Sequence, residues 1–557
     1  MNMKKISLTL LTLMILFGSL GAQNKTQVDR PKLVVGIVVD QMRWDYLYRL
    51  YDRYGEAGFK RLLNEGFSFE NCMVNYIPSF TAVGHSTIYT GSVPSIHGIA
   101  GNDFIEQTTG RSIYCTEDSK VKGVGLDDPE NKVGKMSPYN LQVSTVTDQL
   151  KYATNSRSKV IGVALKDRGS ILPAGHAADA AYWFDAKSGR WITSSYYMKE
   201  LPKWVKQYNS KNMPEKYLSQ DWNPTYPIST YIQSPDSKML GTYELGFKGY
   251  EIPSFPMKTS QMMKTLGVSL IQYTPYGNTT TTDIAKLAID NENLGNNKFG
   301  DTDFLAISYS SPDKMAHHYS INSILTEDAY IKLDQELADL LGYLDRKVGK
   351  GKYLVFLTAD HAGTPNAKYM NENKMSGALR RLTPYEKKIN EYLKLKYGRD
   401  DLVRSFNNYQ VNFNYTAIKQ AGINLEDLKQ TCIDYLQTID GVLYAVDMKK
   451  ASIATVPQYI KEKIINGYNR EYSGEIQIVL GAGSYDLEFY EPTKGGTHGT
   501  WGPDDAHIPF ILMGWKIPHG STTDEVYMTD IAPTISALLK IQMPNGAIGK
   551  PVDYKMK

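Results

Sequence analysis

The sequence has few cysteines, little net charge and no long apolar run beyond its first residues. Its 557 residues include three cysteines and no CxxC pair, which argues against a cysteine-bound metal site. Cys72, Cys115 and Cys432 permit at most one disulfide, for which Cys72–Cys115 is one conceivable pair. The net charge of +3 lacks the basic excess of nucleic-acid-binding proteins, so we expect no nucleic-acid partner. After residue 22 no stretch approaches the roughly eighteen apolar residues of a membrane span.

The first residues have the pattern of a secretory signal peptide. MNMKKISLTLLTLMILFGSLGAQ begins with Lys4 and Lys5, continues with an apolar stretch from Ile6 to Phe17, and ends in small residues. The apolar stretch is too short to span a bilayer comfortably, and no cysteine follows the expected cut. We therefore predict a signal peptide over residues 1–22 and a mature protein from residue 23. This protein is expected in the periplasm or outside the cell, without a membrane anchor.

Three β-branched apolar runs predict strands that are buried on both faces. They are KLVVGIVVD, ending at Asp40, DFLAISYSSPD, ending at Asp313, and KYLVFLTADH, ending at His361. Helical patterns lie between them, and one has leucines at intervals of three and four after an expected N-cap at Thr326. Strands that alternate with helices indicate an α/β protein. We predict a three-layer α/β/α sandwich with a mostly parallel central sheet.

Two long segments depart from this alternation. Residues from about 185 to 275 are rich in Tyr, Trp, Pro and Ser and have little periodicity, as expected of an elaboration over one end of the core. Residues from about 368 to 485 contain a helical pattern, NLEDLKQTCIDYLQTID, and the strand-like GVLYAVDM. We expect the second segment to form a small α/β subdomain. Both are predicted to be insertions in a single catalytic domain of residues 23–557.

Carboxylates and histidines gather where the predicted strands end. In open α/β sheets, ligands bind beyond the carboxyl ends of the strands, and all three runs finish in an aspartate. Asp313 and His317 are four residues apart, so a helical turn would put both on one face. Asp360 and His361 form a direct pair. His498 lies in the glycine-rich KGGTHGTWGP.

This set of Asp and His residues predicts a catalytic centre with two metal ions. Asp and His ligands without thiolates suit zinc, and manganese less well. Six protein ligands are too many for one open tetrahedral zinc, but they supply two ions with three each, and a hydroxyl bound to one ion would become a nucleophile. The stretch NYIPSFTAVGHSTIYTG offers four hydroxyls, which could equally cap helices or close turns: Ser79, Thr81, Ser86 and Thr87.

The motifs taken together resemble those of the alkaline phosphatase superfamily. The closest resemblance is to the PafA-like periplasmic alkaline phosphatases, in which a threonine is the nucleophile. The matching stretches run in family order through essentially the whole mature chain: VVDQMRWDYL, NYIPSFTAVGHSTIYTGSVPSIHGIAGN, KDRGSILPAGHAADAAYWFD, SSPDKMAHHYS, LTADHAGT and GGTHGTWGPDDAHIPF.

The resemblance implies a role for each site residue. It implies a first zinc held by Asp313, His317 and His498. It implies a second zinc held by Asp40, Asp360 and His361, with Thr81 as the nucleophile bridging toward it. Asn102, Lys166 and Arg168 are implied contacts of the phosphoryl oxygens. The expected protein is a phosphate monoester hydrolase with two Zn²⁺, a phosphothreonine intermediate and small phosphorylated metabolites as substrates, and we expect a monomer.

The remaining histidines are predicted to serve in packing or orientation. His85, His97, His176 and His507 lie in matching motifs but outside the implied ligand sets. His318 follows a ligand directly, but the four-residue spacing from Asp313 favours His317. His519 is expected in a surface turn.

Three other functions compete with this prediction. A nucleotide pyrophosphatase or phosphodiesterase on the same bimetallic fold is the main alternative, although such enzymes generally lack the Lys-x-Arg pair found here in LKDRG. A sulfatase is disfavoured because the CxPxR or SxPxR motif is missing at the nucleophile. An inactive binding protein is disfavoured because all six implied ligands are intact.

Overall fold

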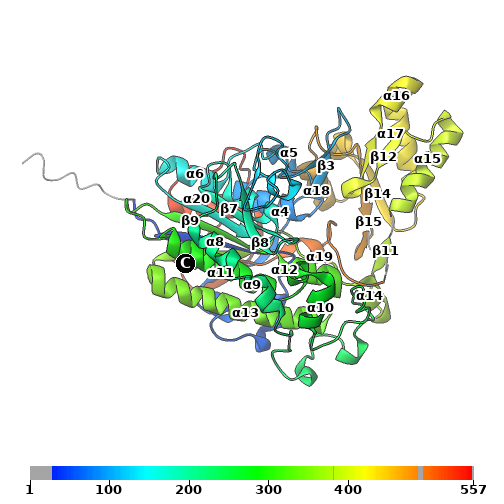
Figure 1. The fold of residues 1–557 in the computed structure, drawn as a ribbon. Helices are drawn as coiled ribbons and strands as arrows, with labels where there is room; N and C mark the ends of the chain where they lie inside the picture. The colour runs from blue at the N-terminus through cyan, green and yellow to red at the C-terminus, as the bar shows by residue number, and fades with distance from the viewer. Residues whose placement is uncertain (1–27, 381, 487–492, 555–557) are drawn as a thin grey trace, which may run out of the picture. The chain divides into compact units, whose positions relative to one another are not determined.

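Apolar strands form the centre of the protein. The computed structural model describes residues 28–380, 382–486 and 493–554. Every residue of β1 (Leu33–Val39), β9 (Asp303–Tyr309) and β10 (Tyr353–Thr358) is buried, because both faces of these strands are covered by helices. β1 pairs in parallel with β9 on one side and with β10 on the other. The three predicted strands are therefore neighbours in one parallel sheet (Figure 1).

The central sheet has eleven strands. Its core, β10-β1-β9-β6-β7, is parallel, and antiparallel strands extend it at both sides. The order is β17-β2-β18-β10-β1-β9-β6-β7-β8-β5, with β19 paired to β2. The strands not yet given are β2 (Phe67–Met73), β5 (Gly123–Val124), β6 (Val160–Ala164), β7 (Ala180–Asp185), β8 (Arg190–Ser194), β17 (His507–Ile508), β18 (Phe510–Gly514) and β19 (Gly520–Tyr527).

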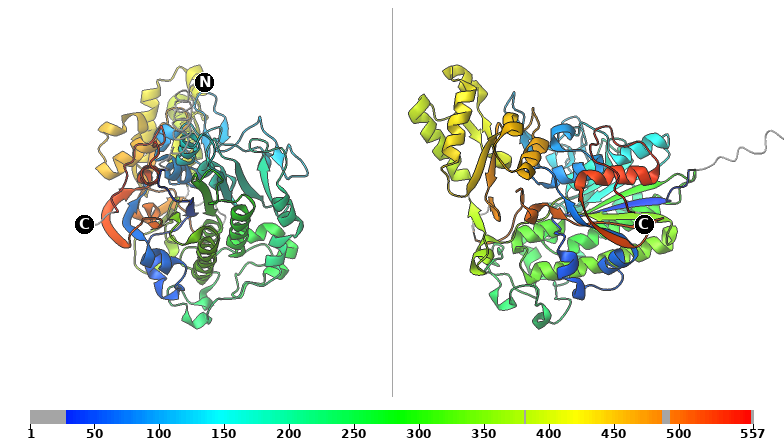
Figure 2. Two further views of the ribbon diagram at one scale, coloured as in Figure 1. Left: turned by 90° about the vertical axis from the view of Figure 1, so that its left-hand side faces the viewer. Right: turned by 180° about the vertical axis from the view of Figure 1, so that it is seen from behind.

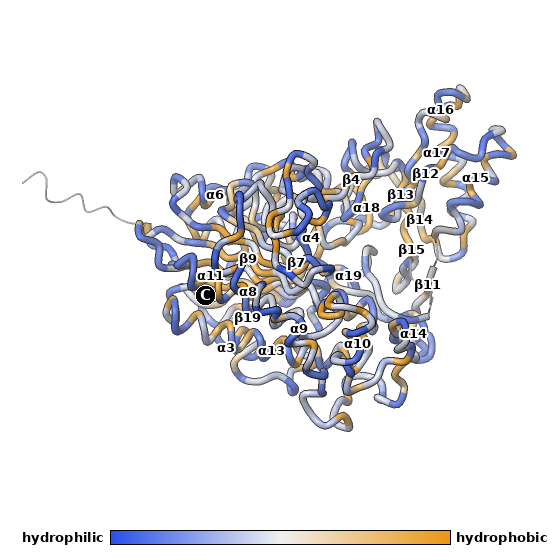
Figure 3. Tube along the Cα trace, in the orientation of Figure 1, coloured by the Kyte–Doolittle hydropathy of each residue, from blue (hydrophilic) through white to orange (hydrophobic). Residues whose placement is uncertain are grey.

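Helices cover both faces of this sheet (Figures 1 and 2). One layer contains α4 (Thr81–Thr90), α6 (Val146–Ala153), α7 (Asp167–Ala174) and α20 (Ile531–Leu539). The other contains α3 (Phe59–Glu65), α8 (Lys203–Ser210), α11 (Tyr276–Asn291) and α13 (Ile324–Leu344). Hydrophobic residues concentrate in the strands between the two layers (Figure 3). The protein is thus the predicted α/β/α sandwich, and all these elements belong to one compact unit, Pro31–Lys557.

The first predicted insertion packs at one edge of the α/β/α sandwich. It contains α8, α9 (Met213–Leu218), α10 (Thr259–Leu266) and short 3₁₀ turns, while its residues 190–194 form β8 and extend the central sheet. The fully buried Trp222 donates its indole N–H to Asp328 Oδ2 at 2.6 Å. This bond fastens the irregular segment to α13.

The second predicted insertion has a hydrophobic core of its own. Its four-stranded antiparallel sheet has the order β12-β13-β15-β14. The strands are β12 (Val403–Ser405), β13 (Gln410–Phe413), β14 (Val442–Asp447) and β15 (Ile476–Leu480). The helices around it are α15 (Thr383–Tyr397), α16 (Tyr415–Ala421), α17 (Leu425–Leu436) and α18 (Gln458–Gly467). Leu428, Cys432 and Leu436 of α17 pack onto the sheet.

Four further predictions concern a helix cap, the cysteines, the signal peptide and membrane-spanning segments. Thr326 is not an N-cap, because α13 begins at Ile324, three residues earlier than predicted. Ser323 is the cap and accepts from the Leu325 N–H, while Thr326 donates to the Ser320 carbonyl at 2.7 Å. All three cysteines are buried free thiols. The predicted signal peptide lies outside the described residues. Within the described part of the chain, no helix combines the length and the apolar character needed to cross a membrane.

Candidate active site

The candidate site forms where four adjacent parallel strands end. In the order β10-β1-β9-β6, these strands are followed by Asp360, Asp40, the start of α12 (Ser311–Tyr319) with Asp313, and Lys166. Because parallel strands end at the same edge of a sheet, residues far apart in sequence come together. All four side chains are buried.

One group of possible metal ligands combines Asp313 with two histidines. Asp313 and His317 share one face of α12, and His317 Nε2 lies 3.1 Å from Asp313 Oδ1. His498 Nε2 lies 3.6 Å from the same oxygen, although His498 comes from a loop near the end of the chain. The three ligand atoms lie close enough together to hold one ion.

A second group lies directly beside the first. Asp40, Asp313 and His361 have ligand atoms close enough to hold an ion. Asp360 Oδ2 lies 3.4 Å from His361 Nε2, whereas Asp40 Oδ1 lies 3.7 Å from it. The rings of His361 and His498 are stacked at 3.5 Å between centroids, so the two groups adjoin. All six predicted ligands thus lie in one cluster, with Asp313 between the two groups.

Backbone carbonyls determine which ring nitrogen carries a proton in the three histidines. Nδ1 of His317, His361 and His498 contacts the carbonyl oxygens of Gly496, Ala362 and Ser79 at 2.8, 2.9 and 2.7 Å. A carbonyl can only accept, so each Nδ1 carries a proton and Nε2 is the nitrogen that faces the carboxylates. Burial lowers the pKa of both His361 and His498, which keeps these rings neutral.

The cluster fits metal ions. Among the described residues, Asp313 Oδ1, Asp360 Oδ2 and His361 Nε2 are buried without a hydrogen-bond partner. Buried polar atoms are rarely left unpaired, and here they point into one common space. Carboxylate oxygens and imidazole nitrogens are ligands that zinc accepts.

Thr81 occupies the first turn of α4, beside this cluster. Its hydroxyl accepts from Lys166 Nζ at 3.3 Å. Position 81 is the first residue of a ten-residue helix, where free N–H groups and the helix dipole favour an anion. Asn102 Oδ1 accepts from the next N–H, that of Ala82, at 2.9 Å. A side chain at Gly84 would overlap the Asp360 carbonyl, so only glycine permits this closeness of α4 to the second group.

Lys166 adjoins Thr81, and a second cation, Arg168, follows it on the chain. Lys166 Nζ lies 2.7 Å from Asp40 Oδ2 and 2.6 Å from Asp313 Oδ2. Burial lowers the pKa of Lys166, but the two carboxylates outweigh burial and raise it above its usual value, so the side chain is charged. Arg168, two residues later, donates to Tyr114 Oη at 3.0 Å, and its buried Nε has no hydrogen-bond partner in the described part of the chain.

The other hydroxyls and histidines lie around the cluster. His85 donates from Nδ1 to the Thr81 carbonyl at 2.8 Å and lies 3.3 Å from Asp360. His97 contacts Thr87 Oγ1 at 3.3 Å behind α4. His318 stacks on Phe247 at 4.1 Å, and burial lowers its pKa to about 4. Ser79 donates to the Thr500 carbonyl at 3.2 Å.

Helix α18 of the second insertion holds the loop that leads to Thr81. Lys463 Nζ donates to the Val74 carbonyl at 2.6 Å, and Asn466 Nδ2 donates to the Asn75 carbonyl at 2.7 Å. Gly467 packs against the Ile77 carbonyl so closely that a side chain would overlap it. Burial lowers the pKa of Lys463 to about 7. Sequence patterns gave no sign of this clasp, because its two halves are joined only by tertiary packing.

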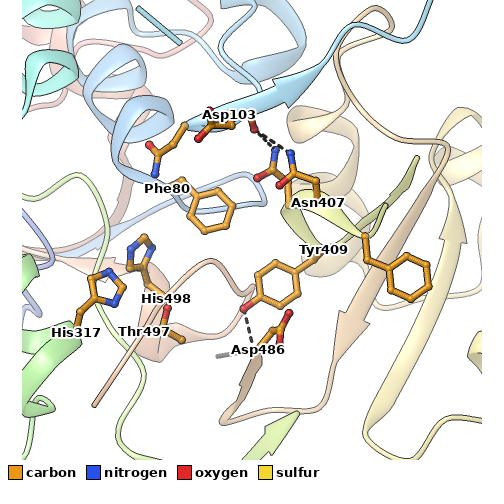
Figure 4. Close-up of a pocket in the computed structure, with 11 residues that line it drawn as sticks. Phe80, Asp103, His317, Asn407, Tyr409, Asp486, Thr497 and His498 are labelled. Carbon is orange, nitrogen blue, oxygen red and sulfur yellow. Dashed lines mark hydrogen bonds between the residues drawn. The ribbon is translucent and has the colours of Figure 1, made fainter. Parts of the chain in front are cut away.

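A cavity of about 280 Å³ opens beside the first group. His317, His498 and Phe80 lie on one side (Figure 4). The opposite side, here named the outer wall, consists of residues of the second insertion and of Asp486 just beyond it: Phe406, Asn407, Asn408, Tyr409 and Asp486. None of these was singled out in the sequence. The paired asparagines before Tyr409 were the one available signal, since Asn tolerates the left-handed conformation better than most residues.

Comparisons with known proteins agree with this geometry. Residues 34–504 match the family model described as type I phosphodiesterase / nucleotide pyrophosphatase. The chain is 52% identical to a protein named calcium-transporting ATPase from Myroides odoratus, over 99% of both chains. It is 48% identical to alkaline phosphatase PhoV from Synechococcus elongatus, over 99% of this chain and 100% of that one.

A solved structure extends the similarity to the fold. Alkaline phosphatase PafA from Elizabethkingia meningoseptica is 46% identical over 98% of both chains. The crystal structure of PafA superposes with a TM-score of 0.90, covering 95% of this chain and 99% of that one. The chain therefore belongs to the type I phosphodiesterase / nucleotide pyrophosphatase family, on its alkaline phosphatase branch, and is a phosphate monoester hydrolase.

Proposed function

We propose that the protein is an exported phosphatase with two zinc ions that transfers the phosphoryl group to Thr81 before releasing it to water. The observation that carries this proposal is the convergence of a helix-terminal hydroxyl, a buried ammonium and two Asp/His groups. Asp313, His317 and His498 would hold one ion, and Asp40, Asp360 and His361 the other. Bound zinc would supply Lewis-acid stabilisation of the attacking and leaving oxygens.

The residues of the chain divide the reaction between them. Thr81 Oγ1 gives up its proton and attacks phosphorus, the bond from phosphorus to the substrate alcohol breaks, and the alkoxide that leaves takes up a proton. Water then attacks the phosphothreonine, phosphate departs, and the threonine hydroxyl is restored. Lys166, at 3.3 Å from Thr81 Oγ1, and Arg168 are suited to the phosphoryl oxygens, because a monoester carries two formal negative charges. Asn102, whose side chain accepts from the Ala82 N–H at the start of α4, is proposed as a third contact.

The proposal includes location and assembly. Residues 1–22 are proposed to direct export to the periplasm or the medium and to be removed, so that the mature chain starts at residue 23. The segments 185–275 and 368–485 are proposed to be insertions in one catalytic domain. The proposed functional unit is a monomer, which light scattering of the purified enzyme would test.

The sharpest test separates monoesters from diesters. In a Lys166→Ala/Arg168→Ala double variant, kcat/KM for an aryl phosphate monoester should fall on the order of hundreds-fold or more, because each charge-assisted contact is worth roughly 1.5–3 kcal/mol. The matched methyl diester should change far less, since one of its oxygens has lost its charge. Zinc content, measured on the same samples, controls for damage to the metal groups. An equal loss on both esters would make the pair structural and would favour a phosphodiesterase.

A further inference from the structure

The cavity beside the first group is placed to receive the alcohol part of the substrate. His317 and His498 line it, whereas Asp40, His361 and Lys166 are not among its lining residues. In an in-line displacement the leaving oxygen lies opposite the attacking one. With Thr81 beside Lys166 and the second group, the alcohol departs on the side of His317 and His498. It therefore lies in the cavity, facing the outer wall.

Aromatic rings line this part of the cavity together with polar side chains. The Phe80 ring meets His498 edge-on at 5.5 Å between centroids and lies nearly parallel to Tyr409, at 6.5 Å and 18°. Figure 4 shows Phe80 between His498 and Tyr409. Gly499 has a φ of +110°, and a side chain there would come within 2.8 Å of Phe80 and 2.9 Å of Tyr409. Glycine thus leaves both rings in place beside the His498 loop.

The backbone holds Tyr409 in an unusual position. Asn408 and Tyr409 both have left-handed φ values, +59° and +57°. This conformation is strained for a bulky residue, and such strain concentrates at functional sites. Two contacts fix it: the Asp486 N–H donates to Tyr409 Oη at 3.1 Å, and Gln477 Nε2 donates to the Tyr409 carbonyl at 3.0 Å.

The neighbouring amides are already engaged elsewhere. Nδ2 of Asn407 and of Asn408 both donate to the Asp103 carbonyl, at 3.2 and 2.8 Å. These bonds fasten the outer wall to the core and engage one N–H of each amide. Tyr409 adds an aromatic ring to this wall, and a planar aromatic alcohol would meet that ring by stacking.

We propose that Tyr409, together with Phe80, determines substrate preference by stacking on the alcohol group, so that monoesters of planar aromatic alcohols are favoured over aliphatic ones. This inference rests on the proposed function, because it takes the phosphoryl group to be held at Thr81. Tyr409 is a specificity-determining residue in this scheme: it touches the departing alcohol and takes no part in the bond changes.

The test uses two monoesters whose alcohols have similar acidity, 4-methylumbelliferyl phosphate and a fluoroalkyl phosphate, with the zinc-loaded full chain. In Tyr409→Leu, kcat/KM for the aryl ester should fall roughly three- to tenfold, as expected for one aromatic contact. The fluoroalkyl ester should change less than about twofold. Tyr409→Phe, the matched control, keeps the ring and should keep the preference. Phe406→Leu, at another position of the wall, should reduce the preference less than Tyr409→Leu.

Inhibition by inorganic phosphate separates the possible outcomes. Phosphate has no alcohol group, so its inhibition constant should be the same in Tyr409→Leu as in the unchanged protein. Equal losses on both esters, or weaker phosphate inhibition, would show that Tyr409 only supports the fold, and would overturn the inference. If phosphate fails to compete even in the unchanged protein, the proposed function itself fails. Thermal melting of each variant shows whether the wall has stayed folded.

Discussion

The cluster of predicted catalytic residues and the outer wall have different origins. The reaction floor is formed by residues at or near the ends of central strands and by the His498 loop: Asp40, Thr81, Lys166, Asp313, His317, Asp360, His361 and His498. The outer wall comes from the second insertion and from Asp486, and it reaches the core through side-chain amides. The floor is suited to any phosphate monoester, whereas the wall meets only the alcohol. Chemistry and preference are therefore carried by different parts of the chain.

The largest effect is expected from removing the proposed nucleophile on the floor. Thr81→Ala should reduce kcat/KM by several orders of magnitude on every monoester, because no covalent intermediate can form. Thr81→Ser keeps the hydroxyl and should remain active. Turnover rates together with zinc content by elemental analysis provide the measurement. Phosphate found by mass spectrometry on Ser79, Ser86 or Thr87 after an acid quench would refute the assignment.

Metal removal should come next in size. The His317→Ala variant should bind about one zinc ion fewer than the unchanged protein. Its activity should fall by more than the roughly 10–100-fold that is typical when a residue hydrogen-bonded to a metal ligand is substituted. His318→Ala is the matched control, since His318 is the next residue but stacks on Phe247 instead of joining a ligand group. Elemental analysis and titration of chelator-treated protein with zinc check both. Equal metal loss in the two variants would contradict the ligand assignment.

The sequence allowed residues of the reaction floor to be predicted, but not those of the outer wall. Asp40, Asp313 and the Asp360–His361 pair could be located because buried parallel strands have a visible apolar pattern and their ends meet at one edge. Tyr409 could not, because its position depends on two left-handed residues and on how the insertion docks against Asp103. Local patterns carry no record of such docking. The Thr326 cap failed for a simpler reason: Ser323, another hydroxyl three residues earlier, is the residue that caps α13.

The first insertion should affect stability without affecting preference. Trp222→Phe removes the hydrogen bond from the indole N–H to Asp328 and leaves a buried carboxylate oxygen with one partner fewer. The free energy of unfolding should fall by about 1–3 kcal/mol, as measured by denaturant titration. The ratio of aryl to alkyl kcat/KM should not move, because no described residue of segment 185–275 lines the cavity. A changed ratio would mean that both insertions select substrates.

The smallest expected effect is on the pH dependence of stability, and it again distinguishes the core from the second insertion. Burial lowers the pKa of His97 to about 3, so between pH 6.5 and 3 the unfolded chain binds a proton that the folded chain refuses. Stability should therefore fall as pH drops through 6.5. The His97→Asn variant keeps an acceptor for the Ile99 N–H. Between pH 7 and pH 5 its free energy of unfolding should fall by on the order of 1–2 kcal/mol less than that of the unchanged protein. Unfolding titrations at the two pH values measure the difference.

Segment 368–485 contains no histidine, so no imidazole of the second insertion contributes to this difference. If the variant and the unchanged protein lose stability equally on acidification, the pH sensitivity of the core must come from other groups, and the buried neutral state of His97 would be wrong.

The clasp of α18 on the loop before Thr81 sets an order of events during biosynthesis. Lys463 and Val74 are 389 positions apart, and their contact is one of those that hold the loop before Thr81, the proposed nucleophile. A chain emerging from a ribosome or a translocon presents Thr81 early, but the helix that steadies its loop comes some four hundred residues later. The loop before Thr81 therefore gains these contacts only when synthesis is nearly complete, so that chains truncated before α18 carry Thr81 without them.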